Sequence, residues 1–191
     1  MRHLSKIATA CCATLTLAFS GCQHYTQPQH PVSSSPINNE FSLQGKIGVK
    51  TPQQSGSAFF NWEQQQQDFD IELTGILGVG KTQIEGRPGQ VTLNSAKTGL
   101  ISAATPEELL ERATGWQAPI THLVSWVQAR PATSNAQLEH DQQQRIQQIQ
   151  EDGWQVELSY NGAATLPNKL LLKQRLAEGQ ENRITMLIQN R

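Results

Sequence analysis

The segment from Gly75 to Thr82 has the residue types and the spacing of a phosphate-binding loop. It reads GILGVGKT, which matches the pattern G-x-x-x-x-G-K-[ST] at every fixed position. In such a loop backbone N–H groups hold the phosphates, Lys81 would reach the terminal phosphates and Thr82 would bind magnesium. Taken alone, this segment would indicate nucleotide binding.

The flanking residues argue against that chemistry. A phosphate-binding loop needs a buried parallel strand before it and a helix after it, because the helix N-terminus helps to bind the phosphates. Residues 68–74 instead alternate acidic and apolar side chains, which is typical of an antiparallel strand with one face in water. After Thr82 the chain soon reaches a Gly-Arg-Pro-Gly turn at residues 86–89, which leaves no room for a helix. We therefore predict that the chain binds no nucleotide.

Without a phosphate to bind, the segment becomes a glycine-rich turn between two strands that carries Ile76, Leu77 and Val79. Turns normally carry polar residues, because their backbone faces water. Either these three side chains fold back into the core, or they form an exposed apolar tip that enters lipid or a partner. The pattern alone leaves both interpretations open.

Cys22 is a second residue with a chemical role. Arg2 and Lys6 precede an apolar stretch at residues 7–19 that is too short to span a bilayer, as in a bacterial secretion signal. The stretch ends in FSGC, which resembles the lipobox of bacterial lipoproteins, whose cysteine is acylated and becomes the first residue of the mature chain. We predict a lipoprotein signal peptide over residues 1–21 and a lipid anchor at Cys22. Ordinary cleavage that leaves a free thiol is the alternative.

The other cysteines support the lipid anchor. Cys11 and Cys12 lie inside the apolar signal and leave with it, so Cys22 has no partner for a disulfide. The residue after it is Gln23 rather than Asp, which is similar to lipoproteins that are sorted to the outer membrane. We therefore expect the mature chain to be attached to that membrane.

No other residues form a catalytic or metal-binding group. His24 and His30 lie in a polar stretch near the anchor, and His122 and His140 are isolated, so none can be paired with a nucleophile or with a zinc ligand. The acidic residues at 68–74 are explained by one wet strand face rather than by calcium. A net charge of -1 gives no electrostatic footprint for nucleic acid. We expect no enzyme activity, no cofactor, no metal and no nucleic acid partner.

The remaining pattern predicts a mainly β domain behind a tether. Residues 22–40, rich in Pro and Ser, lack apolar periodicity and are predicted to be a flexible tether. From Phe41 to about residue 93, apolar residues recur at every second position in short segments, which predicts five or six antiparallel strands of a curled sheet or barrel. Alternation at residues 154–160 and a later closing pair of strands continue the sheet.

Two short helices are predicted between these strands. Thr105-Pro106-Glu107-Glu108 is a capping box with Pro at the first helical position, and Gly115 ends this helix. A second short helix follows Pro119. Helices inserted in a sheet must cover something apolar, so we expect them to cover its open mouth or its concave face. The four tryptophans either fill the core or line a cavity: Trp62, Trp116, Trp126 and Trp154.

Several residues fall in the order and spacing of one family. They are Trp62, the pattern I-x-L-x-G-x-L-G at residues 71–78, E-E-L-L at 107–110 with Gly115, P-x-x-x-L-x-x-W at 119–126, D-G-W at 152–154 and Leu166-Pro167. From about Phe41 to the C-terminus, the chain resembles the LolB family of outer-membrane lipoprotein receptors.

The resemblance implies an incomplete antiparallel β-barrel over residues 41–191, with short helices that lid an apolar cavity for acyl chains. It implies a monomer that faces the periplasm of a Gram-negative bacterium, accepts acylated lipoproteins from the periplasmic carrier LolA and inserts them into the inner leaflet of the outer membrane. Carried over by position, Leu77 is the residue needed for insertion, in a loop with Ile76 and Val79. The candidate cavity residues are Phe60, Trp62, Ile71, Leu73, Ile84, Leu93, Leu109, Leu110, Leu123, Trp126, Val156 and Leu158.

A rival hypothesis and three departures from the family pattern remain. The rival is a structural or assembly-partner lipoprotein of the outer membrane, whose apolar turn and helices dock another protein. Residues 23–40 lack the pattern of the helix that usually precedes the first strand, and Arg130-Pro131 replaces the usual Gly-Pro. The chain ends in Arg191 where a Trp is common, from which we expect a looser last strand.

Overall fold

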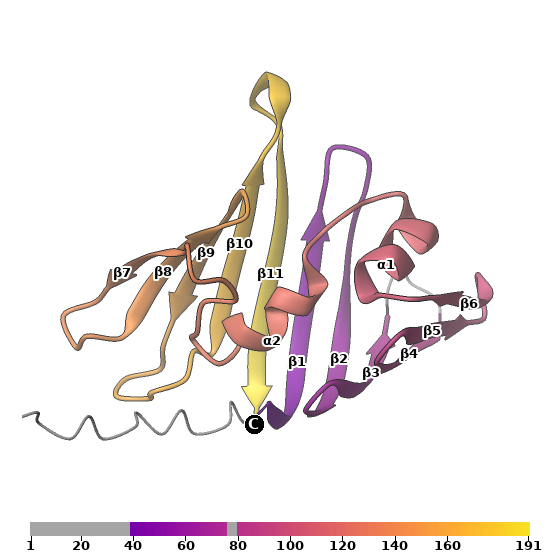
Figure 1. The fold of residues 1–191 in the computed structure, drawn as a ribbon, viewed down its shortest axis with the longest axis horizontal. Coiled ribbons are helices and arrows are strands. Elements are labelled where there is room, and N and C mark those ends of the chain that lie inside the picture. Colours follow the sequence, from indigo (N-terminus) through magenta and orange to yellow (C-terminus); the bar gives the residue numbers. More distant parts are fainter. Residues whose placement is uncertain (1–38, 76–79) are drawn as a thin grey trace, which may run out of the picture. The chain divides into compact units, whose positions relative to one another are not determined.

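The computed structural model describes residues 39–75 and 80–191, which contain eleven strands in one sheet, all paired antiparallel (Figure 1). The strands are β1 (Glu40–Lys50), β2 (Ser55–Gln65), β3 (Asp68–Thr74), β4 (Lys81–Arg87), β5 (Gln90–Ser95), β6 (Gly99–Ala103), β7 (Gln137–His140), β8 (Ile146–Glu151), β9 (Trp154–Ser159), β10 (Lys169–Arg175) and β11 (Glu181–Asn190). The helical elements are α1 (Pro106–Thr114), η2 (Ile120–His122), α2 (Leu123–Trp126) and η3 (Ala177–Gly179).

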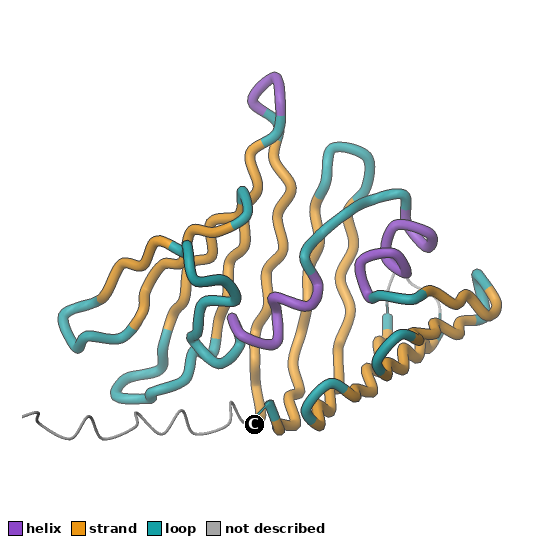
Figure 2. The backbone as a smooth tube through the Cα atoms, in the orientation of Figure 1, coloured by secondary structure: helices purple, strands orange, loops and turns teal. Residues whose placement is uncertain are grey.

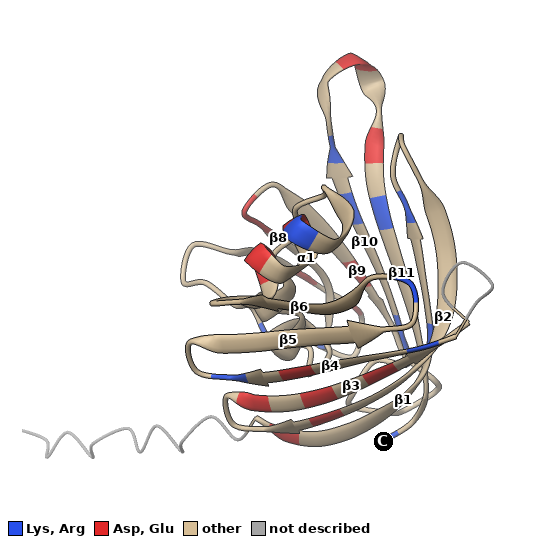
Figure 3. Cartoon of the chain, turned by 90° about the vertical axis from the view of Figure 1, so that its right-hand side faces the viewer, with Lys and Arg blue, Asp and Glu red and all other residues tan. Residues whose placement is uncertain are grey.

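The sheet consists of two meanders that meet in its middle. Its order is β6-β5-β4-β3-β2-β1-β11-β10-β9-β8-β7, so β1 pairs with β11 and the edges are β6 and β7. The chain must cross from one edge to the other between these two strands, and this crossover carries α1, η2 and α2 (Figure 2). The sheet curls around the crossover without closing (Figure 3). The prediction of an incomplete antiparallel barrel with short helices on its concave side is confirmed.

Alternating side chains give the sheet its two faces. In β2, Ala58, Phe60 and Trp62 are buried on the concave face, and the residues between them are exposed on the convex face. Acidic residues recur on the outward positions of β3 and β4 (Figure 3). Burial of the apolar set on one face fixes the register, because a shift by one residue would expose it.

The crossover is packed unevenly against the sheet. Trp126 of α2 is fully buried in the main core together with Trp154, Leu43 and Leu170, which come from β9, β1 and β10. Below α1 the packed contacts are fewer, with Leu109 buried against the small residues of β5 and β6. The part of the curl under Trp126 is therefore filled, whereas the part under α1 keeps room.

The predicted ends of α1 are confirmed. Thr105 Oγ1 accepts a hydrogen bond from Glu108 N at 3.2 Å, and Glu108 Oε2 accepts one from Ala104 N at 2.8 Å. Pro106 occupies the first turn, and Gly115 ends the helix with φ of 71°, a left-handed conformation that glycine adopts without strain. No helix in the described ranges has the length and hydrophobicity needed to cross a membrane.

The expected loosening of the last strand is wrong. β11 pairs with β1 as far as Asn190 and with β10 along seven residues. Arg191 Nη2 donates hydrogen bonds to the carbonyl oxygens of Val127 and Pro167, at 2.7 and 2.6 Å. The C-terminal side chain thus ties the last strand to the end of α2, where the crossover leaves the sheet. The question of a helix before the first strand lies outside the described residues.

Candidate functional site

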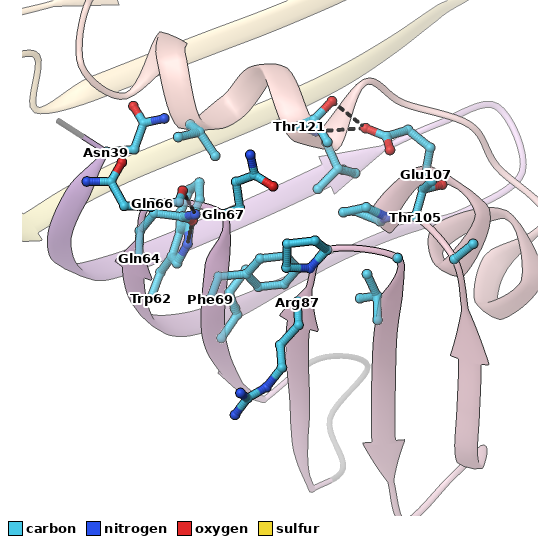
Figure 4. Close-up of a pocket in the computed structure, with 18 of the residues that line it drawn as sticks. Asn39, Trp62, Gln64, Gln66, Gln67, Phe69, Arg87, Thr105, Glu107 and Thr121 are labelled. Carbon is cyan, nitrogen blue, oxygen red and sulfur yellow. Dashed lines mark hydrogen bonds between the residues drawn. The ribbon is translucent and has the colours of Figure 1, made fainter. Parts of the chain in front are cut away.

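Two adjacent hollows lie on the concave face, one beneath α1 and the other between the start of α1 and the segment of η2 and α2. The first, which we call the apolar pocket, has a volume of about 360 Å³ and is lined mainly by Leu73, Ile84, Leu93, Leu109 and Leu110. The second, which we call the amide pocket, has a volume of about 390 Å³ and carries the side chains of Asn39, Gln64, Gln66 and Gln67 (Figure 4). Both are lined by Phe69, Ile71, Pro106 and Ile120. They therefore form a continuous trough along β3.

Strand register brings the apolar wall together. Ile71 pairs with Ile84, Ile84 with Leu93, and Leu93 with Ile101, so four aliphatic residues lie side by side across β3 to β6. Paired residues in an antiparallel sheet point to the same face, and here that face is concave. All four are only half-buried, in contrast to the fully buried core under α2. Three of them, Ile71, Ile84 and Leu93, form an apolar wall of the pocket that the protein leaves partly uncovered.

A close approach at Gly86 sets the place of the Phe69 ring. Phe69 and Gly86 are register partners, and a Cβ atom built at Gly86 would lie 2.0 Å from Phe69 Cε1. Only glycine lets the ring lie over β4 here. The ring consequently forms the floor at the junction of the two pockets.

α1 covers the trough as a lid that is attached at a few points. Leu109 is 3% exposed and is the helix's buried contact with β5 and β6. At the start of the helix, Glu107 Oε1 accepts hydrogen bonds from Thr121 N at 2.7 Å and from Thr121 Oγ1 at 2.8 Å. Arg112 Nη1 donates to Ser102 O at 2.5 Å. The polar attachments are exposed to water, which lowers the free energy needed to release them.

The polar side chains of the amide pocket gather at the turn between β2 and β3. Gln64 is 3% exposed; its Oε1 accepts from Trp62 Nε1 and its Nε2 donates to Gln66 O, both at 2.9 Å. Gln67 extends from the turn toward the helical crossover, whereas the Arg87 guanidinium points away from the other labelled residues (Figure 4). Four of the polar side chains that line this pocket are thus neutral amides, and the others are Thr105, Thr121, Ser125, Glu107 and Arg87.

A buried carboxylate fixes the far end of the crossover. Burial acts to raise the pKa of Glu151, but hydrogen bonds from Ala132 N, Trp126 Nε1 and the N–H and hydroxyl of Thr133 outweigh it and hold that pKa below the ordinary value of 4.5. Glu151 is therefore ionised at neutral pH and fastens the end of α2 to β8. Sequence patterns gave no signal for this residue.

The structure divides the predicted cavity residues into two groups. Those that line a pocket are Trp62, Ile71, Leu73, Ile84, Leu93, Leu109 and Leu110. Those that lie in the main core and line neither pocket are Phe60, Leu123, Trp126, Val156 and Leu158. Of the tryptophans, Trp126 and Trp154 are core, whereas Trp62 is buried and also borders the amide pocket. Contact of any of these residues with acyl chains stays a prediction.

Some lining residues were missed by the sequence prediction. Phe69 alternates with Ile71 and Leu73 on the same strand, so the signal for it was present. Gln64 follows Trp62 by two residues and so continues the buried face of β2. A glutamine at such a position normally indicates that the apolar strand has ended. Ile120 and Val124 line the amide pocket from the crossover, and their positions depend on how the crossover lies on the sheet.

The predicted loop and anchor lie outside the described residues, namely Ile76, Leu77, Val79 and Cys22. The base of the loop is described: Thr74 pairs with Lys81 in an antiparallel hairpin, and Gly75 N donates to Gly80 O at 3.4 Å. Lys81 Nζ forms an ion pair with Glu72 Oε2 at 2.5 Å. A strand therefore follows the glycine-rich segment where a phosphate-binding loop needs a helix. Over residues 39–75 and 80–191, no group of three acidic, His or Cys side chains could hold a metal ion.

Comparison with known proteins gives a consistent result. The family model "Outer membrane lipoprotein LolB" matches residues 39–190. A protein of Stutzerimonas stutzeri named "Outer-membrane lipoprotein LolB" is 40% identical over 154 residues, which cover 78% of this chain and 72% of that protein. A protein of the same name from Pseudomonas putida is 36% identical over 198 aligned positions, covering 94% of both chains. The chain therefore belongs to the LolB family of outer-membrane lipoproteins.

Proposed function

We propose that this chain is a lipid-anchored receptor of the outer membrane, which accepts lipoproteins from the periplasmic carrier LolA and inserts them into that membrane. The observation that carries the proposal is the half-buried aliphatic wall of the apolar pocket, which lies under a lid with few attachments. Such a wall stabilises the folded protein less than a packed core does, but it offers apolar surface to a ligand.

The cargo explains why a shelter is needed. At about 0.8 kcal/mol per CH₂ group, three acyl chains with some fifteen methylenes each would cost on the order of 35 kcal/mol to expose to water. Acyl chains must therefore pass from one apolar site to the next. The transfer makes and breaks no covalent bond, so the proposed role needs no catalytic residue, nucleotide or metal.

The lid must open for the whole cargo to enter. Volumes of about 360 and 390 Å³ are at the small end of the range for ligand pockets, about 300 to 1,000 Å³, and each suits a drug-sized molecule. Three acyl chains need more space. Because α1 is held by exposed hydrogen bonds and by Leu109, outward movement of this helix would join and enlarge the pockets.

Two sites outside the described residues complete the proposal. Cys22 would hold the protein at the inner leaflet of the outer membrane, facing the periplasm, and the loop with Ile76, Leu77 and Val79 would enter the bilayer during insertion. Full burial of Leu77 would contribute about 1.5 to 3 kcal/mol, which supports a reversible contact rather than an anchor. The protein would act as a monomer.

The test is acceptance of cargo by a soluble form that begins after Cys22. We expect mass spectrometry to find acyl chains bound after incubation with loaded carrier, and the cargo to move from the carrier to this protein. A form that stays empty and accepts nothing would rule the proposal out and favour a docking role toward protein.

A matched pair of variants tests whether the pocket is the site. Leu93→Ser should lower the affinity for a fluorescent fatty acid severalfold with little loss of stability, because Leu93 is half-buried in the wall. Leu158→Ala should lower the unfolding free energy by about 2 to 5 kcal/mol with little change in affinity, because Leu158 lies in the packed core. The opposite pattern would place the lipid site elsewhere.

A further inference from the structure

The two ends of the trough differ in the polarity of their side chains, and this difference affects which lipids can bind. The apolar pocket is bounded by aliphatic side chains along most of its length, and the amide pocket adds Asn39, Gln64, Gln66 and Gln67 to an apolar floor. Amide side chains offer N–H donors and carbonyl acceptors without net charge. Such a lining suits neutral polar groups.

Cationic groups do not face the amide pocket from the described residues that line it. Among the described residues, Arg87 is the only Lys or Arg in that lining, and its guanidinium is directed away from the other labelled residues (Figure 4). Arg130 does not line the pocket, but its Nη2 donates to Asn39 Oδ1 at 2.8 Å. Glu107, the one carboxylate among the described lining residues, already accepts two hydrogen bonds from Thr121. A phosphate placed among these amides would lose water without gaining a direct ion pair from a lining side chain that faces it, which is unfavourable.

The lipoprotein cargo carries a neutral linkage instead of a charged phosphate. An acylated cysteine joins its chains through ester and amide groups, which are neutral acceptors with one N–H donor. Glutamine amides can donate to ester carbonyls and accept from a peptide N–H. The buried Gln64 is held in place by Trp62 and Gln66, so one polar group at the pocket wall is preorganised.

We infer that the amide pocket receives the neutral ester and amide linkage of an acylated cysteine, and that it thereby selects lipoproteins over phospholipids. The inference rests on the proposed function and adds the basis of its specificity. Discrimination has a clear use, because a lipid-binding cavity at a membrane meets phospholipids in large excess. In this arrangement the acyl chains extend along β3 toward Leu73, near the base of the loop between β3 and β4.

One lysine lies at the opposite end of the trough. Lys97, in the exposed turn between β5 and β6, borders the apolar pocket together with Ser95 and Thr98. A lipid that entered with its polar group toward this turn would meet a cation. The test must therefore distinguish the two ends.

The experiment measures displacement of a fluorescent fatty acid from the protein by three competitors with the same acyl chains. They are a cysteinyl peptide with a dipalmitoylglyceryl group and an N-acetyl group, dipalmitoylglycerol, and dipalmitoyl phosphatidylglycerol, which adds only the charged headgroup to the diester. We expect the first two to compete at similar concentrations and the phosphatidylglycerol to require at least about ten times more, which is the effect of one missing charge-assisted hydrogen bond.

A gain-of-function variant locates the discrimination. Gln67→Lys adds a cation at an exposed turn position without removing a described hydrogen bond of the fold, and it should improve phosphatidylglycerol binding about tenfold relative to dipalmitoylglycerol binding. Gln65→Lys is the matched control: it adds the same charge at an exposed position of β2 that borders neither trough pocket, and it should change neither competitor.

Three results would overturn the inference. Equal competition by phosphatidylglycerol and dipalmitoylglycerol on the unmodified protein would show that there is no discrimination. No effect of Gln67→Lys, combined with loss of phosphatidylglycerol binding in Lys97→Gln, would place the polar group at the other end of the trough. If neither the lipopeptide nor dipalmitoylglycerol displaced the fatty acid, the proposed function would fail together with the inference.

Discussion

Glu151 shows how one side chain can hold a crossover to a sheet. Its carboxylate is 4% exposed and accepts hydrogen bonds from α2 and from both backbone and side chain of the segment that follows. An ionised group in such a place is stable only when its oxygens are satisfied, and here they are. The filled part of the curl therefore depends on a charge that sequence periodicity does not reveal.

Glu151→Gln should lower the unfolding free energy by about 2 to 3 kcal/mol at pH 7, because the amide gives one weaker acceptor and places an N–H₂ group among donors. Since the folded-state pKa lies below 4.5, the contribution of Glu151 is present above that pH and is lost as pH falls through the folded-state value. Urea unfolding at pH 7 and pH 3 measures this.

The control is the difference between the two proteins across that pH range. The natural chain should lose more stability on acidification than Glu151→Gln does, because the variant lacks this titrating group. Equal losses would mean that Glu151 does not couple folding to pH.

Leu77 tests the interpretation of the glycine-rich turn as an exposed tip. Leu77→Glu should leave uptake of cargo and thermal stability nearly unchanged, and insertion into membranes should fail, because a carboxylate is costly to place among acyl chains. Transfer from the loaded carrier and release into vesicles are measured separately. If uptake and stability collapse together, Leu77 belongs to the core. Lys81→Ala serves as a control and should change neither step, since Lys81 pairs with Glu72.

At the scale of elements, α1 combines well-formed ends with few packing contacts. Its capping box satisfies the first turn, and Gly115 ends the last, so the helix is locally stable without the sheet's full support. Its buried attachment is Leu109. This combination suits a lid, which must move as a unit rather than unfold.

Thr105→Ala removes the oxygen that accepts from Glu108 N and should cost about 1 kcal/mol, confined to α1. Hydrogen exchange should become faster in α1 than in β1 and β11, and a bound fatty acid should dissociate faster. Thr105→Ser keeps the oxygen and should behave like the natural chain. A uniform increase of exchange across the sheet would show that α1 does not open independently.

Local sequence patterns predicted these strands and the ends of α1 well. They did not predict features that depend on contacts between residues far apart in the sequence. Alternation of apolar residues predicted β2 and β3, and the residues from Thr105 to Gly115 predicted both ends of α1, because each signal lies within a few residues. The division of the candidate residues was not predictable. Phe60 and Ile71 have the same pattern, and only the position of the crossover makes one core and the other pocket wall.

At the scale of the whole domain, the pairing of β1 with β11 decides the topology. Gly45 and Ile188 are partners although nearly the whole domain lies between them. Such a contact has no local signature, so the curled sheet followed from strand count and from family resemblance. The same pairing puts both β-meanders side by side and leaves β6 and β7 as edges, which forces the helical crossover over the concave face.

The register also limits how the domain can reach the membrane. β1 begins at Glu40, at the same end of the sheet as the turn between β2 and β3. The base of the β3–β4 loop lies farther along the strands from this end. Its residue Thr74 pairs with Phe59, and Phe59 pairs with Lys46 of β1. From Glu40 to Lys46 a strand advances about 20 Å. If Cys22 and the loop reach the same membrane, the residues between Cys22 and Glu40 must span at least this distance.

Removal of residues 25–36 should therefore slow insertion. Positions 23–39 number seventeen residues and can extend about 56 Å, whereas the five that remain after the deletion reach only about 17 Å. We expect the shortened protein to accept cargo from the loaded carrier at the normal rate but to release it into membranes slowly. Replacement of the same twelve residues by a Gly/Ser segment of equal length should restore release, because reach rather than sequence is required. Normal release from the shortened protein would mean that the loop between β3 and β4 does not contact the membrane that holds the anchor.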